Sequence, residues 1–553
     1  MSQTIKYLLL GLTLLLLGII LGFQLKGWMP GGAQGLGDDK LDKLQRTFAF
    51  VNGTYVEEPD ENKLIDDAIK GMMEGLDPHS FYIPPAEMGQ MSEQMEGSFD
   101  GIGVQFNILE DTIYIESPLP GGPSEKLGIM AGDRIIKVDG KVVAGTGITN
   151  NEVMRLLKGA RGTQVRISIL RRGYPSELEY TITRDKIPLN SLEYAYMIAP
   201  GTGYIRITRF AETTYQEFKT ELGRLQLAGM QNLILDLRGN PGGYMNMAYK
   251  MADEFLSDGK MIVSTEGRTA QSKQAYHATA SLNSFEKGAL IVLIDYGSAS
   301  ASEIVAGAVQ DHDRGLIVGV RSFGKGLVQV QEEFEDGSAI RIVVSRYHTP
   351  SGRCIQKPYT EGSEAYEDEI NRRFESGEIF DASKLKFPDS LQYKTTAGRT
   401  VYGGGGIYPD IFVADDTTGS SPYFTGLRLQ DMFRRFAVDY ADRHPELART
   451  YPLAQDFVSR FEVTPEIGQD FVQFAAAKGV AADPAGYDIS RRHIENRIKA
   501  YIGRKLFNDP AFYPVLHQTD RVLMRAVELI PAASALEATG KLPQLADALD
   551  NRQ

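Results

Sequence analysis

Ser300 lies at a position where a serine could act as a nucleophile. It follows the apolar run 290–294, which predicts a buried strand, and it precedes residues 304–310, which predict a helix. A serine at such a strand-to-helix turn faces the unpaired N–H groups of the helix N-terminus, which would favour a developing oxyanion. The alternative is a plain helix cap, because serines and small residues are also what N-caps use.

Lys325 is the candidate base, since a serine needs a base to become a nucleophile. It follows the predicted strand 316–320 and lies among glycines and apolar residues. A lysine acts as a base only when neutral, and desolvation would lower its pKa from a reference value of about 10.4. Gln329 shares the parity of Lys325 in an extended strand and could accept a hydrogen bond from its amine. The alternative for Lys325 is an ordinary surface charge.

Several other chemistries fit the sequence poorly. Residues 319–325 match the G-x-x-x-x-G-K phosphate loop, but Gly326 stands where a magnesium-binding Ser or Thr belongs, and a strand follows instead of a helix. The 7 histidines form no HxxxH or HxxEH pair, and Cys354 is the 1 cysteine, which argues against zinc sites and excludes a disulfide within the chain. The net charge of −13 argues against sequence-independent nucleic-acid binding. We therefore expect no metal and no organic cofactor.

A glycine-rich loop precedes the predicted strand 104–108. Its residues are Gly101, Ile102, Gly103 and Val104. Successive backbone N–H groups could grip a carboxylate there, because the glycines leave room for it. Downstream, residues 128–140 resemble the G-L-x-x-G-D-x-I-x-x-V-x-G run of PDZ domains. The resemblance implies that the loop binds the carboxylate of a peptide tail, although a simple β-turn is the alternative when the loop is taken alone.

The elements that must position these residues fall into blocks along the 553 residues. Apolar residues at three- and four-residue spacing predict helices over residues 40–75. Short strands with Gly and Pro turns fill residues 97–186. Apolar strands alternate with amphipathic helices over residues 187–413, which predicts an α/β core. From residue 427 onwards the pattern is mostly helical, with core candidates that include Leu523, Ala526 and Leu529.

The N-terminal segment contains an apolar run at residues 7–23, interrupted by Thr13 alone. Such a run is long enough to span a membrane and longer than most signal-peptide cores. The sequence therefore predicts an inner-membrane anchor at residues 7–25, with a cleaved signal segment as the alternative. In both cases we expect the remaining chain in a bacterial periplasm or at the cell surface.

Taken together, motifs in a fixed order resemble the C-terminal processing peptidases, also called tail-specific proteases, a Ser/Lys family. The resemblance covers nearly all of residues 64–413. Ser322 stands where the family often has threonine, but it keeps the hydroxyl. Besides the PDZ run, the motifs are L-D-P-H-S at 76–80, L-D-L-R-G-N-P-G-G at 235–243, S-A-S-A-S-E at 298–303, F-G-K-G at 323–326, T-P-S-G-R at 349–353 and G-G-I-Y-P-D at 405–410.

The resemblance implies roles for particular residues. Ser300 would be the nucleophile, Lys325 the base and Gln329 the residue that orients the base. Part of the oxyanion hole would come from Gly242 or Gly243, with the N–H of Ala301 as the other donor. The function implied is a serine endopeptidase that cleaves exported proteins near their C-termini, with the PDZ domain binding the substrate tail. The alternative is an exported PDZ scaffold with an inactive core.

The fold class expected is multidomain α/β. The resemblance implies a crotonase/Clp-peptidase-like α/β spiral core with an inserted β-rich PDZ domain. Protein substrates with accessible C-terminal tails are the expected partners, and the membrane is contacted through the N-terminal helix. The expected divisions are an anchor or signal segment and tether (1–36), an N-terminal helical region (37–95), the PDZ domain (96–186), the peptidase core (187–416) and a C-terminal helical region (417–553).

The remaining polar residues admit more than one interpretation. Glu303 and Asp311 match acidic positions of the family motif, but helix capping and a structural ion pair explain them equally well. His312 lacks an evident carboxylate to orient its ring, so a Ser/His pair is not expected. Residues 361–378 predict a solvated acidic insertion. Residues 417–553 contain no readable motif, and dimerisation or adaptor docking through their apolar helix faces is a hypothesis.

Overall fold

The computed structural model describes residues 38–544 except 120, 172, 281–284 and 415–418. The chain divides into two compact units, residues 1–75 and 76–553. In the first unit, helices α2 (Asp38–Thr54) and α3 (Glu61–Glu74) agree with the helical pattern of the sequence. The apolar segment 7–25 that we expected to enter the membrane lies outside the described residues. None of the helices within the described ranges is long and apolar enough to cross a bilayer.

The PDZ block is a six-stranded antiparallel sheet that closes over an aliphatic core. Its strand order is β3-β4-β5-β7-β8, with β6 paired to β5. Ile113, Ile135, Val153 and Ile167 are buried together in the core. The elements are β3 (Val104–Leu109), β4 (Thr112–Pro118), α5 (Pro123–Lys126), β5 (Arg134–Val138), β6 (Lys141–Val142), α6 (Asn150–Leu157), β7 (Gln164–Leu170) and β8 (Leu178–Thr183).

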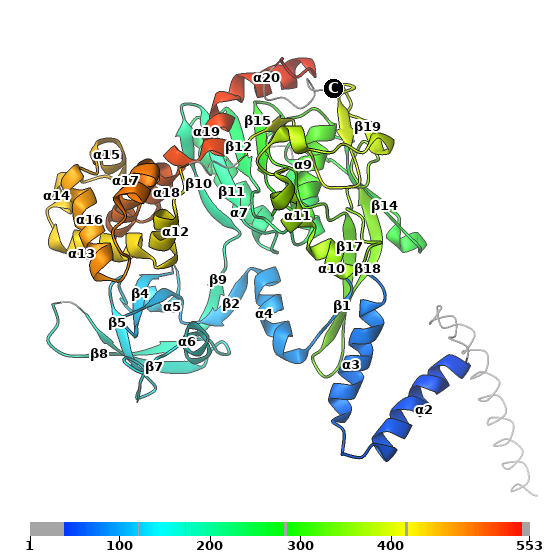
Figure 1. Cartoon of the computed structure of the whole chain (residues 1–553), viewed down its shortest axis with the longest axis horizontal. Coiled ribbons are helices and arrows are strands. Elements are labelled where there is room, and N and C mark those ends of the chain that lie inside the picture. The colour runs from blue at the N-terminus through cyan, green and yellow to red at the C-terminus, as the bar shows by residue number, and fades with distance from the viewer. Residues whose placement is uncertain (1–37, 120, 172, 281–284, 415–418, 545–553) are drawn as a thin grey trace, which may run out of the picture. The chain divides into compact units, whose positions relative to one another are not determined.

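Two short strands mark where the chain enters and leaves this block. Strand β2 (Ser98–Gly101) pairs antiparallel with β9 (Asp185–Pro188), so that Ser98 lies opposite Pro188. Figure 1 shows this pair between the PDZ sheet and helix α4 (Pro85–Glu96). A domain whose two ends meet in this way is an insertion, because the chain returns to the point that it left.

The α/β core is built on a six-stranded sheet with the order β10-β11-β12-β15-β16-β21. Strands β11 to β21 run parallel, and β10 is antiparallel to β11. Central strands of a parallel sheet are covered on both faces and read as continuous apolar runs, as residues 290–294 do. The strands are β10 (Leu192–Ala199), β11 (Thr202–Ile207), β12 (Asn232–Asp236), β15 (Leu290–Ile294), β16 (Leu316–Gly319) and β21 (Ile411–Phe412).

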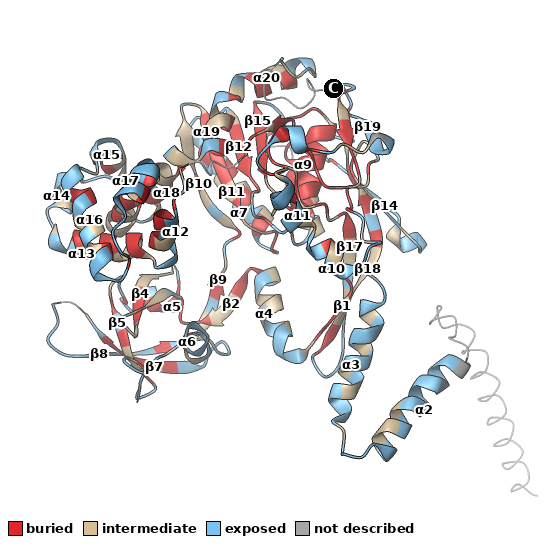
Figure 2. Ribbon diagram, viewed as in Figure 1, coloured by how far each residue is buried: buried red, intermediate tan, exposed pale blue. Residues whose placement is uncertain are grey.

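The two faces of this sheet are covered by helices from distant parts of the chain. Alternate residues such as Leu235 and Val292 pack against α7 (Thr214–Leu227), α8 (Met245–Asp253) and α9 (Ala301–Asp311). The intervening residues, such as Ile234 and Leu293, pack against α19 (Arg521–Glu528) and α20 (Ile530–Thr539). The strands are buried on both sides (Figure 2).

A second, antiparallel sheet stands beside the core. Its strand β17 follows directly after the loop that contains Lys325, called the lysine loop below. The sheet has the order β1-β18-β13-β14, and β17 also pairs with β18. A small hairpin of β19 (Gln392–Lys394) and β20 (Thr400–Tyr402) follows later in the chain. The strands of the second sheet are β1 (Phe81–Ile83), β13 (Met261–Gly267), β14 (Gln274–His277), β17 (Leu327–Glu333) and β18 (Ala339–His348).

The C-terminal region consists of helices, but they belong to two packing groups. One group encloses its own aromatic core, in which Phe436, Phe457 and Phe471 are buried. The other group, α19 and α20, completes the peptidase sheet. A domain boundary at residue 417 therefore places α19 and α20 in a different region from the sheet on which they pack. The first group comprises α12 (Pro422–Leu429), α13 (Met432–Arg443), α14 (Leu447–Thr450), α15 (Ala454–Arg460), α16 (Pro465–Ala477), α17 (Pro484–Phe507) and α18 (Asp509–Leu516).

The acidic stretch 361–378 is mostly exposed to solvent, as its composition predicted, but it is folded. It forms helices α10 (Ser363–Glu367) and α11 (Glu369–Ser376), in which Tyr366 and Arg373 are buried. Part of the charge in this stretch is nevertheless paired within the fold. Arg321 forms ion pairs with Glu369 at 3.3 Å and with Glu378 at 2.6 Å.

Candidate active site

The turn that carries Ser300 is held in a strained conformation between β15 and α9. Ser300 has φ 55° and ψ −112°, and a positive φ is uncommon for a residue other than glycine. The neighbouring serines tie the turn to the loop that follows β12. The hydroxyl of Ser298 donates to the Leu237 carbonyl at 2.8 Å, and that of Ser302 donates to the Asn240 carbonyl at 3.0 Å. The serine turn and the loop after β12 therefore form one rigid assembly.

Lys325 lies in the loop between β16 and β17, where its amine is largely withdrawn from water. Its Nζ donates to the Oε1 of Gln329 at 2.8 Å, which is the hydrogen bond that the sequence spacing predicted. Burial, assisted by the positive charge of Arg341, lowers the pKa of Lys325 to about 8. At neutral pH a substantial minority of the molecules then carry a neutral amine, unlike an exposed lysine.

The amide of Gln329 is fixed from its other end by the L-D-P-H-S segment. Its Nε2 donates to the carbonyl of His79, and the His79 ring nitrogen Nε2 lies 2.7 Å from the hydroxyl of Tyr366. Burial lowers the pKa of His79 to about 4, with a further contribution from the Lys325 charge. The ring is therefore neutral at pH 7. The NH₂ group of the Gln329 amide is occupied by the His79 carbonyl, so the amide oxygen faces Lys325.

Glu303 joins the serine turn to the lysine loop. Its buried carboxylate accepts hydrogen bonds from the N–H of Ser300 at 2.8 Å, of Lys325 at 2.9 Å and of Gly324 at 2.7 Å, and from the hydroxyl of Ser322 at 2.5 Å. Burial raises the pKa of Glu303 to about 7, against the hydrogen bonds, which lower it. Glu303 thus combines a capping contact with a cross-link, and Ser322 keeps the hydroxyl that this cross-link uses.

Tyr347, on β18, makes a second connection between the two catalytic candidates. Its hydroxyl lies 3.0 Å from the carbonyl of Ser300 and 2.6 Å from that of Lys325, and the side chain is 1% exposed. A single donor placed between the two carbonyls fixes the spacing of the two backbones.

The loop after β12 brings two glycines to the serine. A Cβ on Gly242 would lie 2.8 Å from the Cβ of Ser300, and Gly242 has φ 99°, so only glycine fits there. The N–H of Gly242 donates to the Asn240 side chain at 2.9 Å. Phe210 pairs in parallel with Gly243 through the Gly242 carbonyl and the Tyr244 N–H. In this pairing the N–H of Gly243 points away from Phe210.

Two backbone donors are consequently available next to Ser300. Within the described part of the chain, the N–H groups of Gly243 and Ala301 have no hydrogen-bond acceptor. The Ala301 nitrogen would lie 3.0 Å from a Cβ on Gly242, which places it beside the loop. The geometry distinguishes between the two glycines, since the N–H of Gly242 is already engaged.

These groups line one cleft of about 530 Å³. Ser300, Lys325 and Gln329 contribute to its wall together with Gly242 and Gly243. Across the residues that the structure describes, no cluster of three or more His, Cys, Asp or Glu side chains could hold a metal ion. Much of the remaining wall is apolar, and its residues include Met91, Met95, Tyr244, Met245, Ile304 and Leu327.

The predicted tail-binding loop lies apart from this cleft. Gly101 ends β2, Gly103 has φ 73°, and Val104 begins β3. Ile102 is buried, and its carbonyl accepts from both the N–H and the hydroxyl of Ser124. Strand β3 stands at the edge of the PDZ sheet, so an added peptide strand could pair with it.

Two further sequence candidates occupy the far end of α9. The carboxylate of Asp311 pairs with Arg353 at 2.7 Å, and both side chains are fully buried. The His312 Nε2 lies 2.7 Å from the carbonyl of Met261. The helix separates both residues from Ser300 by about 17 Å at 1.5 Å per residue. Asp311 therefore belongs to a structural ion pair.

The fold and the cleft together define a serine-type peptidase core with an inserted PDZ domain, and the sequence comparisons agree. Residues 201–362 match peptidase family S41, and residues 114–171 match the PDZ domain. Residues 29–85 match the N-terminal domain of the activating protease CtpB, and residues 423–508 match a family of unknown function. The chain belongs to the carboxy-terminal processing proteases of family S41.

Individual relatives match more than half of the chain. The carboxy-terminal processing protease CtpA of Bacillus subtilis is 38% identical over 322 residues, which are 58% of this chain and 68% of the relative. A carboxy-terminal-processing protease of Bartonella bacilliformis is 39% identical over 321 residues, 57% of this chain and 73% of the relative. The solved photosystem II D1 C-terminal processing protease has 30% identity and a TM-score of 0.32, with 58% of this chain and 91% of that chain covered.

Several residues at the site had no assigned role in the sequence. Tyr347 lies in a strand that gives no motif, and Tyr366 lies in the stretch taken for a solvated insertion. His79 belonged to a motif that carried the family resemblance, and that motif was the available signal. The dual role of Glu303 could not be read from a capping pattern, because its other donors are about 20 positions away.

Proposed function

We propose that Ser300 and Lys325 form a catalytic dyad, oriented by Gln329, that cleaves exported proteins near their C-termini. The observation that carries the proposal is the hydrogen bond of 2.8 Å between the Lys325 Nζ and the Gln329 Oε1, in a cleft that also contains Ser300. A neutral amine that donates one hydrogen to Gln329 keeps its lone pair for the serine proton. Membership of a family of serine-type peptidases supports this assignment.

In the first step, the Ser300 Oγ attacks the carbonyl carbon of the scissile peptide bond, and its proton passes to the Lys325 Nζ. The negative charge moves to the carbonyl oxygen, where the N–H groups of Gly243 and Ala301 stabilise it. The Lys325 ammonium then gives its proton to the leaving amine as the C–N bond breaks. An ester to Ser300 results.

In the second step, Lys325 takes a proton from a water molecule, and the resulting hydroxide attacks the ester carbonyl. The same two N–H groups bind the second oxyanion. Collapse of the intermediate releases a product with a new C-terminal carboxylate and restores the serine hydroxyl. No group outside the cleft is required for either proton transfer.

The PDZ domain selects the substrate in this proposal. The loop of Gly101, Ile102, Gly103 and Val104 binds the tail carboxylate, and the tail pairs with the edge strand β3. Because this loop lies outside the catalytic cleft, the tail and the scissile bond are recognised at separate places. We also propose that the enzyme works outside the cytoplasm, held in the membrane by residues 7–25.

Activity of the purified full-length chain on casein and on tail peptides tests the dyad. We expect Ser300→Ala and Lys325→Ala to abolish turnover, and Lys325→Arg to be inactive as well, because arginine does not lose its proton. The matched control is His312→Gln, which changes a half-buried residue at the other end of α9. Turnover by Lys325→Ala would overturn the dyad, and so would inactivation by His312→Gln in a folded protein.

Tail recognition is tested with paired peptides that differ only at the C-terminus. A free carboxylate should be cleaved faster than its amide, because amidation removes the charge that the glycine-rich loop would bind. Equal rates would remove the PDZ loop from the proposal. Peptide binding without any cleavage by the wild-type chain would favour the inactive scaffold.

A further inference from the structure

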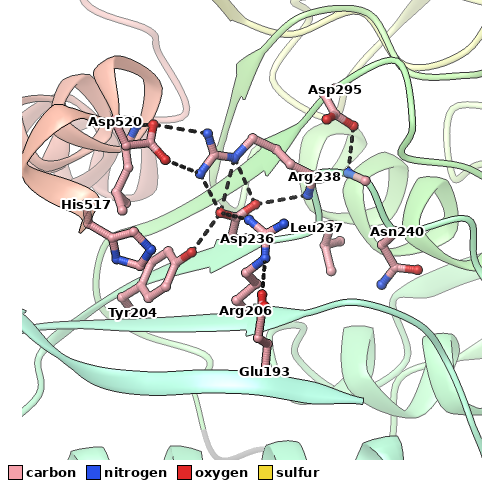
Figure 3. A network of polar contacts seen from close by, with 12 residues as sticks. Glu193, Tyr204, Arg206, Asp236, Leu237, Arg238, Asn240, Asp295, His517 and Asp520 are labelled. Carbon is pink, nitrogen blue, oxygen red and sulfur yellow. Dashed lines mark hydrogen bonds and ion pairs between the residues drawn. The ribbon is translucent and has the colours of Figure 1, made fainter. Parts of the chain in front are cut away.

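The guanidinium of Arg238 lies between two carboxylates that come from distant parts of the chain (Figure 3). One is Asp236, at the end of β12, which pairs with Arg238 at 2.6 Å. The other is Asp520, 282 positions away, which accepts from both terminal nitrogens of Arg238, at 3.1 and 2.7 Å. A bidentate contact of this kind fixes the plane of the guanidinium as well as its position.

Arg238 is also the first residue of the loop that ends at Gly243. On the side of the serine turn, the loop is tied by Gly239, whose N–H donates to Asp295 at 2.8 Å. On the side of β11, the Asn240 side chain donates to the Ile207 carbonyl at 2.9 Å. Arg238 ties the start of the loop to Asp520, the cap of α19. Figure 3 shows Asp520 and Asp295 on different sides of the loop, with Arg238 between them.

Asp520 is itself held firmly by the C-terminal segment. It caps helix α19, because its Oδ1 accepts from the Leu523 N–H at 2.9 Å. Leu523 packs on the peptidase sheet, and the nearby ring of His517 packs against Tyr204. The carboxylate therefore acts from a support that does not move independently of the core.

The negative charge of Asp236 is neutralised by groups other than Asp520. Asp236 is already balanced by Arg238 and by Arg206, whose Nη1 lies 3.2 Å away, and it also accepts from the Tyr204 hydroxyl at 2.8 Å. Asp236 accepts from the Nε and Nη2 of Arg238, and Asp520 adds a second pair of contacts, to Nη1 and Nη2, that ties the guanidinium to the C-terminal segment. Arg238 begins a loop whose Gly243 must be placed accurately, since an oxyanion hole depends on the exact position of its donors.

We propose that Asp520 is a positioning residue for the oxyanion hole, so that the C-terminal segment is part of the catalytic apparatus. The inference rests on the proposed function, in which Gly243 stabilises the oxyanion. An interaction made only in the transition state changes kcat and leaves substrate binding nearly unchanged. A purely structural contact would lower the stability without that signature.

The test uses Asp520→Asn in the full-length chain. Asparagine still caps α19 but removes the charge that holds Arg238. Displacement of the loop by a fraction of an ångström should lower kcat about ten- to hundredfold, with KM within about twofold. The affinity for a peptide aldehyde, whose adduct places an oxygen in the hole, should fall by the same factor. The matched control is Asp483→Asn, which removes the same charge from the cap of α17, where Asp483 accepts from the Gly486 N–H.

Each outcome either supports or overturns the inference about Asp520. A wild-type kcat for Asp520→Asn, or a reduced kcat with unchanged aldehyde affinity, overturns the inference, and so does an equal loss in Asp483→Asn. If Asp520→Asn does not fold, Asp520→Glu, which keeps the charge but displaces it, gives the same readout. Failure of the proposed function is seen separately, as turnover by Ser300→Ala.

Discussion

Two buried carboxylates hold the two halves of the active site, and they do so by different means. Glu303 holds the serine and the lysine through N–H and O–H donors of residues 300–325. Asp236 holds the start of the loop of residues 238–243, called the oxyanion loop below, through the cations of Arg206 and Arg238. Burial by itself would raise the pKa of both groups. Neutral donors leave the pKa of Glu303 raised to about 7, whereas the two cations hold that of Asp236 well below its usual range.

The contacts of Glu303 join segments that are close in the sequence, whereas the network around Asp236 includes a contact between distant segments. The serine–lysine half is assembled from two neighbouring loops of the core. The half that we propose as the oxyanion hole is tied, through Arg238, to Asp520, 282 positions later in the chain. Variants at the two carboxylates should therefore fail in different ways, and the predictions below are ordered by the size of the expected effect.

The largest loss of stability is expected for Asp236→Asn. It removes the charge of the buried carboxylate that Arg206 and Arg238 share, and breaking a buried pair costs about 3–5 kcal/mol. Urea unfolding measures this loss. The control is Glu193→Gln, which removes the partly exposed partner of Arg206 and should cost less than about 1 kcal/mol. Equal losses for the two variants would show that burial of the charge is not what distinguishes Asp236.

A smaller loss of stability, with a large loss of activity, is expected for Glu303→Gln. The amide NH₂ would face donors that now point at an oxygen, and each donor left unsatisfied costs about 1–3 kcal/mol. Because these donors belong to both catalytic loops, turnover should fall much further than the stability does. Calorimetry and peptidase assays on the same preparation separate the two effects. Full activity in Glu303→Gln would remove its role as the cross-link.

The pH dependence of kcat/KM should reveal the lysine. Lys325 must be neutral, so the rate should rise about tenfold per pH unit on the acid side and level off above a pH of about 8. Arg341→Gln removes a positive charge that lowers the pKa of Lys325, so its profile should move to higher pH. Glu303→Gln removes a negative charge that raises this pKa, so any residual activity should move to lower pH. Shifts in the same direction would contradict the assignment.

The stability of the protein in acid should depend on His517, whose ring packs against Tyr204. Burial lowers the pKa of His517 from 6.5 to about 4. The unfolded chain then binds the proton more readily, so stability is lost as the pH falls from about 6.5 to 4, by about 3 kcal/mol. His517→Phe keeps a ring against Tyr204 and should flatten this slope. His79 contributes a similar slope that His517→Phe leaves in place.

The smallest effect is expected for Tyr347→Phe. It removes one hydroxyl shared by two carbonyls, neither of which takes part in the chemistry, so kcat should fall only a few-fold. Peptidase assays at saturating substrate measure the change. A loss as large as that of Glu303→Gln would mean that the tyrosine, and not the carboxylate, sets the spacing of the loops.

The parts of the site that lie close together in sequence were predictable. The turn of Ser300 follows from an apolar strand, small residues and a helix, and the contact between Lys325 and Gln329 follows from their spacing. That contact forms although the register of β17 shifts between Val328 and Gln329, which parity alone could not foresee. The PDZ insertion was evident because its motif spans many positions.

Contacts between distant segments could not be predicted. Residues 361–378 are mostly exposed, as their composition predicts, but composition does not show that Arg321 pairs with two of them. Asp520 carries no motif, since a helix cap in isolation predicts only the helix. Leu523 and Leu529 were expected in a core, but their apolar pattern does not show that this core is the peptidase sheet.

The covering of the sheet by α19 and α20 also has a consequence for the time at which the protein becomes active. The face that includes Ile234 and Leu293 stays exposed to water until residues up to 536 have been synthesised. Contacts such as that between Tyr196 and His517 span 321 positions, and such separations slow folding. A partly made chain therefore has no finished oxyanion loop. We expect the nascent protein to be inert as a protease and to need protection from aggregation until its synthesis has passed these helices.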